Sequence, residues 1–195
     1  LDKSLTIDLN GKTVTSTAQK AFEVYANATI TSTATDADGK INGTIKGAER
    51  AVDTRTKVNL SLTNVNLATT ATGVNTQPLT IGGSDHGTIV NMENVNINAG
   101  NAGYGIITFV ETALTATNST IGGYSALYVK PGSDNSTFNF VKSTLSGSTA
   151  SSDVEGNSFT TIAVRANNVT VNADAASTVN ATGNHCYALS FGSSY

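Results

Sequence analysis

Residues 101–132 read NAGYGIITFVETALTATNSTIGGYSALYVKPG and contain nearly the same pattern twice. In each half a tyrosine, first Tyr104 and then Tyr124, is followed by small residues, a short apolar pair and a polar turn. Repetition of this kind is the sequence signature of folds that stack copies of one supersecondary unit. The stretch therefore predicts further copies elsewhere in the chain.

Apolar residues recur with the spacing i, i+2, i+7 in five places. These are Ile7/Leu9/Val14, Leu60/Leu62/Leu67, Val90/Met92/Ile97, Leu114/Ala116/Ile121 and Phe138/Phe140/Leu145. Val169/Val171/Val179 repeats the spacing with one extra residue, and Ile45 is the last member of a degraded copy. The pattern predicts seven copies with a mean period of about 27 residues.

A second apolar pair follows each copy after a variable gap. The pairs are Phe22/Val24, Leu79/Ile81, Ile107/Phe109, Leu127/Val129, Ile162/Val164 and Leu189/Phe191, with Val52 alone in the degraded copy. The spacing i, i+2 is typical of a strand with one buried face. Because so short a unit cannot bury its own apolar row, the copies must stack, with each strand pairing with its counterpart in the next copy.

We therefore predict an all-β fold, a single-stranded parallel β-helix (β-solenoid) of about seven coils that forms one domain over residues 1–195. A β-sandwich would instead need antiparallel hairpins with tight Asn-Gly turns between neighbouring strands. The in-register repeat argues against that alternative.

Two polar rows support the stacking. Asn42, Asn64, Asn94 and Asn118 each lie three residues before the last apolar member of a copy, where stacked amides can hydrogen-bond along the axis. A second, outward row comprises Thr13, Thr44, Asn66, Asn96, Thr120, Thr144 and Thr178. A flat threonine ladder is also typical of ice-binding solenoids, but the single file and irregular coil lengths favour the simpler interpretation that threonine suits outward strand positions.

Composition narrows the function classes. Thr (31), Asn (21), Ser (19) and Gly (18) make up 89 of the 195 residues, and the formal net charge is −3, so there is no basic surface typical of nucleic-acid binding. No run approaches the ~18 apolar residues of a membrane span, so we expect no membrane insertion. Cys186 is the single cysteine, which excludes an internal disulfide and a thiolate metal cluster.

The chain begins at Leu1 without a basic and apolar leader, so we expect a mature or excised piece of a longer protein with neighbouring domains. A chain poor in cysteine and rich in threonine and asparagine is typical of exported bacterial proteins. We therefore expect an extracellular location, at the cell surface or secreted.

The opening coil LTIDLNGKTVT (residues 5–15) and the asparagine row resemble the pectate-lyase-like superfamily of right-handed parallel β-helices. In particular, coils such as VNLSLTNVNL (58–67) and IVNMENVNI (89–97) look like those of β-helical domains in large bacterial surface and adhesin-like proteins. The resemblance covers essentially the whole chain and implies a right-handed coil. It implies little about activity, because this superfamily includes lyases, hydrolases and binding proteins.

Catalytic chemistry on such a fold would require clustered carboxylates that flank one glycosidic bond. The predicted outward row of the first strands contains one acid, and it reads Asp8, Ser61, Asn91, Thr115, Asn139, Thr170. Other acids lie at unmatched positions of the repeat: Glu23, Glu93, Glu111, Asp153 and Asp174. Arg50, Arg55 and Arg165 are scattered along the chain. We therefore predict no catalytic residues and no cofactor.

Two local motifs contain residue types that occur in catalytic or metal sites. Asp85-His86, in GGSDHGTIV, combines a residue that transfers protons near neutral pH with a neighbouring carboxylate, but its glycine-flanked setting favours a turn. Asp36 and Asp38, in TDADGKING, are spaced as in a calcium loop, but the later bidentate acid is missing. We predict no metal site and interpret both motifs as polar turns.

The tyrosines are the candidate ligand-binding residues. Tyr104 and Tyr124 each lie five residues before the last apolar member of their second pair, and Tyr128 alternates outward between two apolar residues. Stacked coils would bring all three together. Aromatic faces among amides and hydroxyls suit sugar rings, although an aromatic stack that closes a turn is the alternative.

The sequence thus predicts a non-enzymatic, adhesin-like β-helix domain of a bacterial surface protein. Its partner would be a glycan or another host-surface ligand, or the domain would act as a rigid stalk that presents its neighbours. The alternative is a polysaccharide lyase or glycoside hydrolase of the pectate-lyase-like superfamily, with a site that the repeat pattern does not reveal.

Overall fold

The computed structural model describes residues 1–34, 43–73, 76–100, 102–148, 159–183 and 186–192. Over these residues the chain forms strands β1 to β19 and no helix. Every pair of neighbouring strands is parallel. The described part of the chain accordingly has no helix that could cross a membrane.

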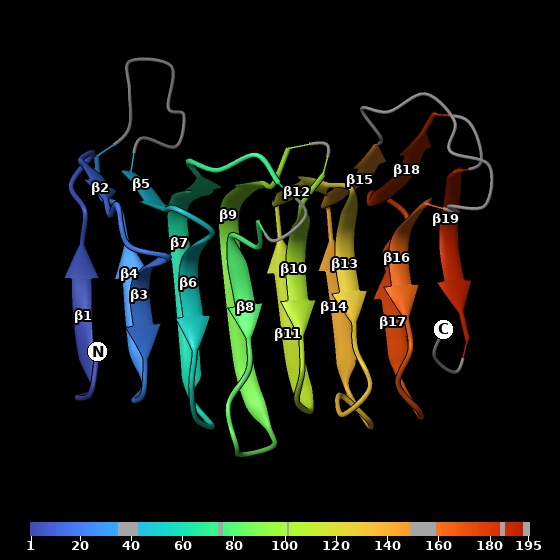
Figure 1. Cartoon of the computed structure of the whole chain (residues 1–195), viewed down its shortest axis with the longest axis horizontal. Helices are drawn as coiled ribbons and strands as arrows, with labels where there is room; N and C mark the ends of the chain where they lie inside the picture. Colours follow the sequence, from blue (N-terminus) through green and yellow to red (C-terminus); the bar gives the residue numbers. More distant parts are fainter. Residues whose placement is uncertain (35–42, 74–75, 101, 149–158, 184–185, 193–195) are drawn as a thin grey trace.

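The strands follow one another in seven sets, which lie side by side along the long axis (Figure 1). The first three sets are β1 (Leu5–Asp8), β2 (Thr13–Thr15) and β3 (Lys20–Val24); β4 (Ala28–Thr31), β5 (Gly43–Gly47) and β6 (Arg50–Thr54); and β7 (Asn59–Thr69) with β8 (Leu79–Ile81). The others are β9 (Thr88–Asn98) with β10 (Tyr104–Thr108); β11 (Thr112–Thr117), β12 (Thr120–Gly123) and β13 (Ser125–Val129); β14 (Thr137–Val141), β15 (Thr144–Ser148) and β16 (Phe159–Val164); and β17 (Thr170–Ala173), β18 (Thr178–Thr182) and β19 (Cys186–Phe191).

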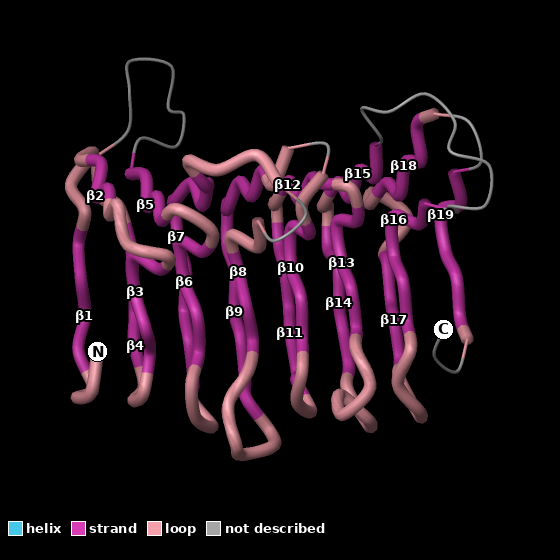
Figure 2. The backbone as a smooth tube through the Cα atoms, in the orientation of Figure 1, coloured by secondary structure: helices cyan, strands magenta, loops and turns pink. Residues whose placement is uncertain are grey.

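Two sheets result from this order. The first has 12 strands and contains two parallel paths, β1-β4-β7-β9-β11-β14-β17 and β2-β5-β7-β9-β12-β15-β18, because the long strands β7 and β9 belong to both. The second sheet has seven strands in the order β3-β6-β8-β10-β13-β16-β19. Figure 2 shows these strands joined by turns at both ends of each set. Each strand pairs with its counterpart in the neighbouring set, which is consistent with a parallel β-solenoid.

The core is a continuous apolar stack along the axis. In β9 the side chains alternate between buried and exposed up to Glu93, as one buried face requires. Val90 pairs in register with Leu60 on one side and Leu114 on the other, and all three are fully buried. Full burial of one such side chain stabilises the fold by roughly 1.5–3 kcal/mol. The repeated apolar rows therefore account for the stacking.

The outward threonine row is confirmed by the register of the strands. Thr13 pairs with Thr44, and the same row continues through the later sets as Asn66, Asn96, Thr120, Thr144 and Thr178. The asparagine row is confirmed in part. Asn64, Asn94 and Asn118 share a left-handed backbone, with φ of 55°, 52° and 49°, whereas Asn42 lies outside the described residues.

The two ends of the repeat differ from the predicted alignment. Leu5 and Ile7, rather than Ile7 and Leu9, occupy the rows that continue to Leu60 and Leu62. The segment between Ile7 and Val14 in the first set is two residues longer than the equivalent segment between Leu62 and Leu67 in the third set. Its turn passes through Asn10 and Gly11, with φ of 44° and 73°. In the last set Val171 and Ala173 take these rows instead of Val169 and Val171.

The second set was the degraded copy in the sequence. It contains the full strand β4, in which Ala28 and Ile30 supply the inward pair. The apolar spacing does not reveal this pair, because a long polar insertion separates Ile30 from Ile45. The outward row of the first path also shifts at its ends, where Thr6 and Asn172 replace Asp8 and Thr170.

Candidate functional site

The three candidate tyrosines lie together on the outer side of the second sheet. Tyr104 begins β10, Tyr124 directly precedes β13 and Tyr128 lies within β13. The ring centroid of Tyr104 is 5.9 Å from that of Tyr124, in an edge-on arrangement, and 5.1 Å from that of Tyr128. All three side chains are half-buried. The prediction that stacking brings them together is confirmed, and we call this group the tyrosine cluster.

A close approach of two backbone segments, at Gly103 and Gly123, holds the tyrosine cluster in place. The backbone N–H of Tyr124 donates to the carbonyl oxygen of Gly103 over 2.7 Å. A Cβ atom on Gly123 would lie only 2.7 Å from that same oxygen. Because Gly103 and Gly123 have no side chains, the segments that carry Tyr104 and Tyr124 can approach this closely.

The register of β10 differs from the predicted one by a single residue. Ile106 and Thr108 point into the core in place of Ile107 and Phe109, since Ile106 pairs with Leu79 and Leu127, and Thr108 pairs with Ile81 and Val129. A shift of one residue exchanges the two faces of a strand. The hydroxyl of Thr108 satisfies its buried position by donating to Oγ of Ser133 over 3.0 Å.

This shift adds residues to the site that the sequence analysis did not assign. Phe109 is 37% exposed and lies on the outer side beside the tyrosine cluster. The Nζ atom of Lys130 is 5.1 Å from the ring centroid of Phe109 and 5.8 Å from that of Tyr128. A cation at this distance is attracted to the ring face. Ile107 pairs in register with Tyr128 and is almost fully buried.

The hydroxyls of Tyr104 and Tyr124 stay protonated at neutral pH. Burial raises the pKa of Tyr104 above its ordinary value, and the neighbouring Tyr128 raises it further. Burial, Tyr104 and Cys186 raise the pKa of Tyr124 in the same way. A neutral phenol both donates and accepts a hydrogen bond. The cluster thus combines apolar ring faces with hydroxyl groups that can act as hydrogen-bond donors or acceptors toward a polar ligand.

A group of charged side chains, the ion cluster, lies on β3 and β6 of the same sheet. Asp53 is buried, and its Oδ2 atom is 3.0 Å from Nζ of Lys20, 3.0 Å from Nη1 of Arg50 and 3.5 Å from Nη1 of Arg55. Glu23 pairs in register with Asp53 and contacts Lys20 over 2.5 Å. The prediction that Glu23 is unmatched and that Arg50 and Arg55 are scattered is therefore wrong.

The ion cluster escaped the sequence analysis because of one substitution in the repeat. Thr54 occupies the row of Val24 in the second set, so the apolar pair that marks other sets is incomplete there. Aligning Thr54 with Val24 would have placed Asp53 beside Glu23. Alignment by position rather than by apolar character could thus have found the cluster.

The carboxylate of Glu23 in the ion cluster is held in its charged form by neighbouring cations. A hydrogen bond from Lys20 lowers the pKa of Glu23, and the charges of Lys20 and Arg55 lower it further. A general acid in polysaccharide cleavage needs the opposite shift, so that it carries a proton near neutral pH. The geometry of Glu23 therefore suits ion pairing rather than proton donation.

The other sequence candidates lie apart from both clusters. Asp85 and His86 are exposed in the turn that precedes β9, where Nδ1 of His86 accepts the backbone N–H of Glu111 over 3.5 Å. Asp36 and Asp38 lie outside the described residues. Across the described ranges, no three His, Cys, Asp or Glu side chains gather closely enough to hold a metal ion.

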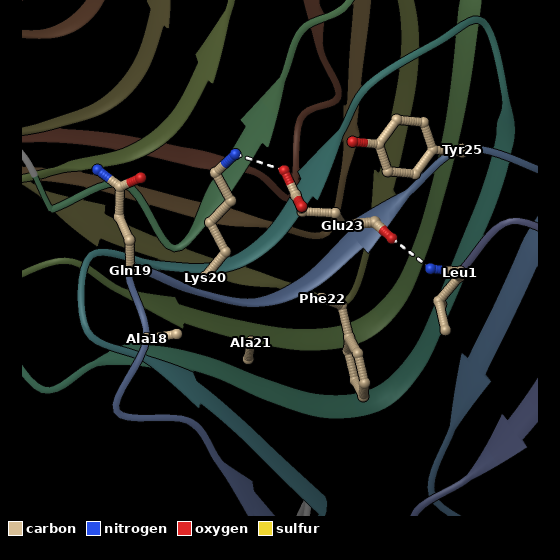
Figure 3. Close-up of a pocket in the computed structure, with 8 residues that line it drawn as sticks. All are labelled: Leu1, Ala18, Gln19, Lys20, Ala21, Phe22, Glu23 and Tyr25. Atoms are coloured by element: carbon tan, nitrogen blue, oxygen red, sulfur yellow. Dashed lines mark hydrogen bonds and ion pairs between the residues drawn. The ribbon is translucent and has the colours of Figure 1, made fainter.

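A pocket lies at the N-terminal end, where β3 is an edge strand of the second sheet (Figure 3). Its walls include Leu1, Lys20, Phe22, Glu23 and Tyr25. Figure 3 shows the side chains of Lys20 and Glu23, both on β3, meeting at their charged ends, and the amino group of Leu1 donating to the carbonyl oxygen of Glu23. The pocket borders the ion cluster and contains no member of the tyrosine cluster.

Comparison with known proteins gives no match to a protein-family model, to a curated protein sequence or to a solved structure.

Proposed function

We propose that the chain is a right-handed parallel β-helix of about seven coils, of the pectate-lyase-like kind, from an extracellular bacterial adhesin-like protein. In this proposal the domain is not an enzyme and binds a glycan on the outer side of the second sheet. The observation that carries the proposal is the meeting of the Tyr104 ring with those of both Tyr124 and Tyr128.

The composition of the patch supports a sugar ligand. Sugar rings have apolar faces and hydroxyl edges, which aromatic side chains with polar tips can contact together. Tyr104, Tyr124 and Tyr128 offer both, and Phe109 adds a further exposed ring. The sheet beneath fixes their backbones, so little conformational entropy is lost when a ligand binds.

A panel of neutral, host-type and plant-type glycans tests the proposal, with binding measured in calcium and again in chelator. The variant in which Tyr104, Tyr124 and Tyr128 are replaced by Ala is expected to lose the selective binding of the unmodified chain. Tyr187→Ala is the matched control, because Tyr187 is 52% exposed on β19 of the same sheet. A rigid presenting stalk is the conclusion if no glycan binds.

A second candidate function is polysaccharide cleavage by a lyase or hydrolase. The observation that favours it is the pair of carboxylates, Glu23 and Asp53, beside Lys20 and two arginines. Release of new reducing ends or unsaturated products from any glycan of the panel would support this candidate if Glu23→Gln abolished it. Replacement of both Asp85 and His86 is expected to leave glycan binding intact in either case.

A further inference from the structure

Positive charge is concentrated on the side of the molecule that carries the tyrosine cluster. Lys20, Arg50, Arg55, Lys130 and Arg165 lie on the second sheet or directly after its strands, together with two acids, Glu23 and Asp53. Five cations and two anions give a formal charge of +3. The whole chain has a charge of −3, so the remainder of the chain carries −6. An anionic ligand would be attracted to this side and repelled elsewhere.

The ion cluster does not neutralise itself. Three cations share Oδ2 of Asp53, and the Glu23 carboxylate contacts two of the same three. Three positive charges against two negative ones leave one positive charge in excess. Arg55 is the cation best placed to meet a ligand, since 40% of its side chain is exposed, compared with 18% for Lys20 and 21% for Arg50.

One row of the second sheet connects the ion cluster to the tyrosine cluster. The backbone N–H groups of Arg55, Gly82, Phe109 and Lys130 donate to equivalent carbonyl oxygens in successive sets, so these four residues are neighbours along the axis. The row spans three strand spacings, about 14 Å. Gly82 has no side chain, which leaves the space between Arg55 and Phe109 uncovered by this row.

Cations and an aromatic ring thus share one row, and this arrangement favours ligands that carry negative charge. Neutral sugars are satisfied by ring faces, hydroxyls and amides, whereas carboxylate and sulfate groups form stronger, charge-assisted hydrogen bonds with Lys and Arg. We propose that the glycan bound by this side of the protein is anionic, with a carboxylate or sulfate group over Arg55 and another near Lys130. This inference rests on the proposed glycan binding and assigns the ligand its chemical class.

Three dextrans of equal length test it, because they share one backbone and differ only in charge: unmodified dextran, carboxymethyl-dextran and dextran sulfate. Binding of the full chain is measured by calorimetry at low ionic strength and again in about 0.5 M salt, which is about threefold above physiological ionic strength and screens exposed charges more strongly. At least one charged dextran is expected to bind about ten-fold more tightly than dextran and to weaken in salt. Comparison of the two charged polymers separates carboxylate from sulfate recognition.

Arg55→Gln and Lys130→Gln, made singly and together, are expected to reduce this preference. Lys130→Gln keeps the test valid if loss of Arg55 disturbs the ion cluster. The matched control is Lys12→Gln with Lys46→Gln, which removes the same charge from β5 and from the turn before β2 on the other sheet. An equal loss of preference in the control would attribute binding to net charge alone and overturn the inference.

The inference and the proposed function can fail separately. Equal binding of all three dextrans, lost in the triple tyrosine variant, would overturn the anionic ligand and leave glycan binding in place. Charge-selective binding that survives in the triple tyrosine variant would support the cationic row and overturn the tyrosine cluster as the platform. If none of the dextrans binds, the anionic ligand is overturned, and the glycan panel alone decides the proposed function.

Discussion

The side-chain amide of Asn94 donates a hydrogen bond of 2.8 Å to Oδ1 of Asn64 in the preceding set of strands. Both residues have a left-handed backbone, with φ of 52° and 55°. Asparagine is among the few residues that adopt this conformation readily, and here its side chain also joins two neighbouring sets. The corner of the coil thus depends on asparagine for its backbone and for its hydrogen bond.

Asn94→Ala is expected to lower the free energy of unfolding by about 2 kcal/mol, because it adds left-handed strain and removes a partly buried hydrogen bond. Asn94→Gly keeps the backbone freedom and should cost about 1 kcal/mol. Urea unfolding followed by circular dichroism measures both. An alanine variant as stable as the glycine variant would show that the backbone conformation contributes nothing.

The register of β10 predicts unequal effects for two phenylalanines. Phe140 is buried in the core, whereas Phe109 is 37% exposed. Phe140→Ala is expected to cost about 3–5 kcal/mol through the lost burial and the cavity. Phe109→Ala should change stability by less than about 1 kcal/mol. Urea unfolding measures both variants. If the two substitutions destabilise the chain equally, the alignment predicted from the sequence, in which Phe109 points inward, would be correct after all.

The middle of the repeat was predictable because consecutive copies keep the same short turn. Four residues, one of them an asparagine with a left-handed backbone, separate Leu62 from Leu67 in β7 and Met92 from Ile97 in β9. One spacing therefore aligns these two sets along both paths of the first sheet. The register of β10 was harder to predict. Residues 105–110 include apolar residues next to one another, so a period of two does not decide which of them point inward.

The ion cluster required information that the sequence pattern does not carry. Lys20 and Asp53 are 33 positions apart and meet only when β3 and β6 are placed in register. The tyrosine cluster was easier to predict, since Tyr104 and Tyr124 follow similar glycine-containing turns in adjacent sets. Even so, the placement of Phe109 and Lys130 at that site depends on the register of β10, which the sequence pattern does not decide.

The adjacent glycines Gly122 and Gly123 of β12 give a matched test of the close backbone approach at the tyrosine cluster. A Cβ on Gly123 would contact three backbone atoms at 3.0 Å or less, whereas the nearest atom to a Cβ on Gly122 lies 3.8 Å away. Gly123→Ala is expected to destabilise by about 1–3 kcal/mol and to alter the near-ultraviolet circular dichroism of the tyrosines. Gly122→Ala should do neither, and similar spectra for both variants would contradict the proposed packing.

The ion cluster predicts that its two acids contribute unequally to stability. Asp53→Asn leaves three cations around a neutral side chain and is expected to cost about 2–4 kcal/mol, somewhat reduced by the partial exposure of the cations. Glu23 is 40% exposed, so Glu23→Gln should cost less than about 1 kcal/mol. Chemical unfolding at low and high salt compares them. A larger effect for Glu23 would be incompatible with Asp53 as the centre of the network.

Acid stability depends on carboxylates at the turns of the first sheet. The hydroxyl of Thr33 and the backbone N–H groups of Asn10 and Thr33 donate to Asp8 and lower its pKa, and Ser177 and Lys142 act likewise on Asp174. A folded-state pKa below the unfolded value, near 3.9, means that this stabilisation is present above about pH 4 and is lost as the pH falls through the folded value.

The midpoint of thermal unfolding should therefore fall as the pH is lowered from about 5 to 2, and less steeply in the Thr33→Val variant. That variant removes the largest cause of the lowered pKa of Asp8 but keeps the carboxylate. Thr29→Val, the same change on β4, is the control and should retain the slope of the unmodified chain. Identical slopes for Thr33→Val and Thr29→Val would mean that the contact between Thr33 and Asp8 does not contribute to acid stability.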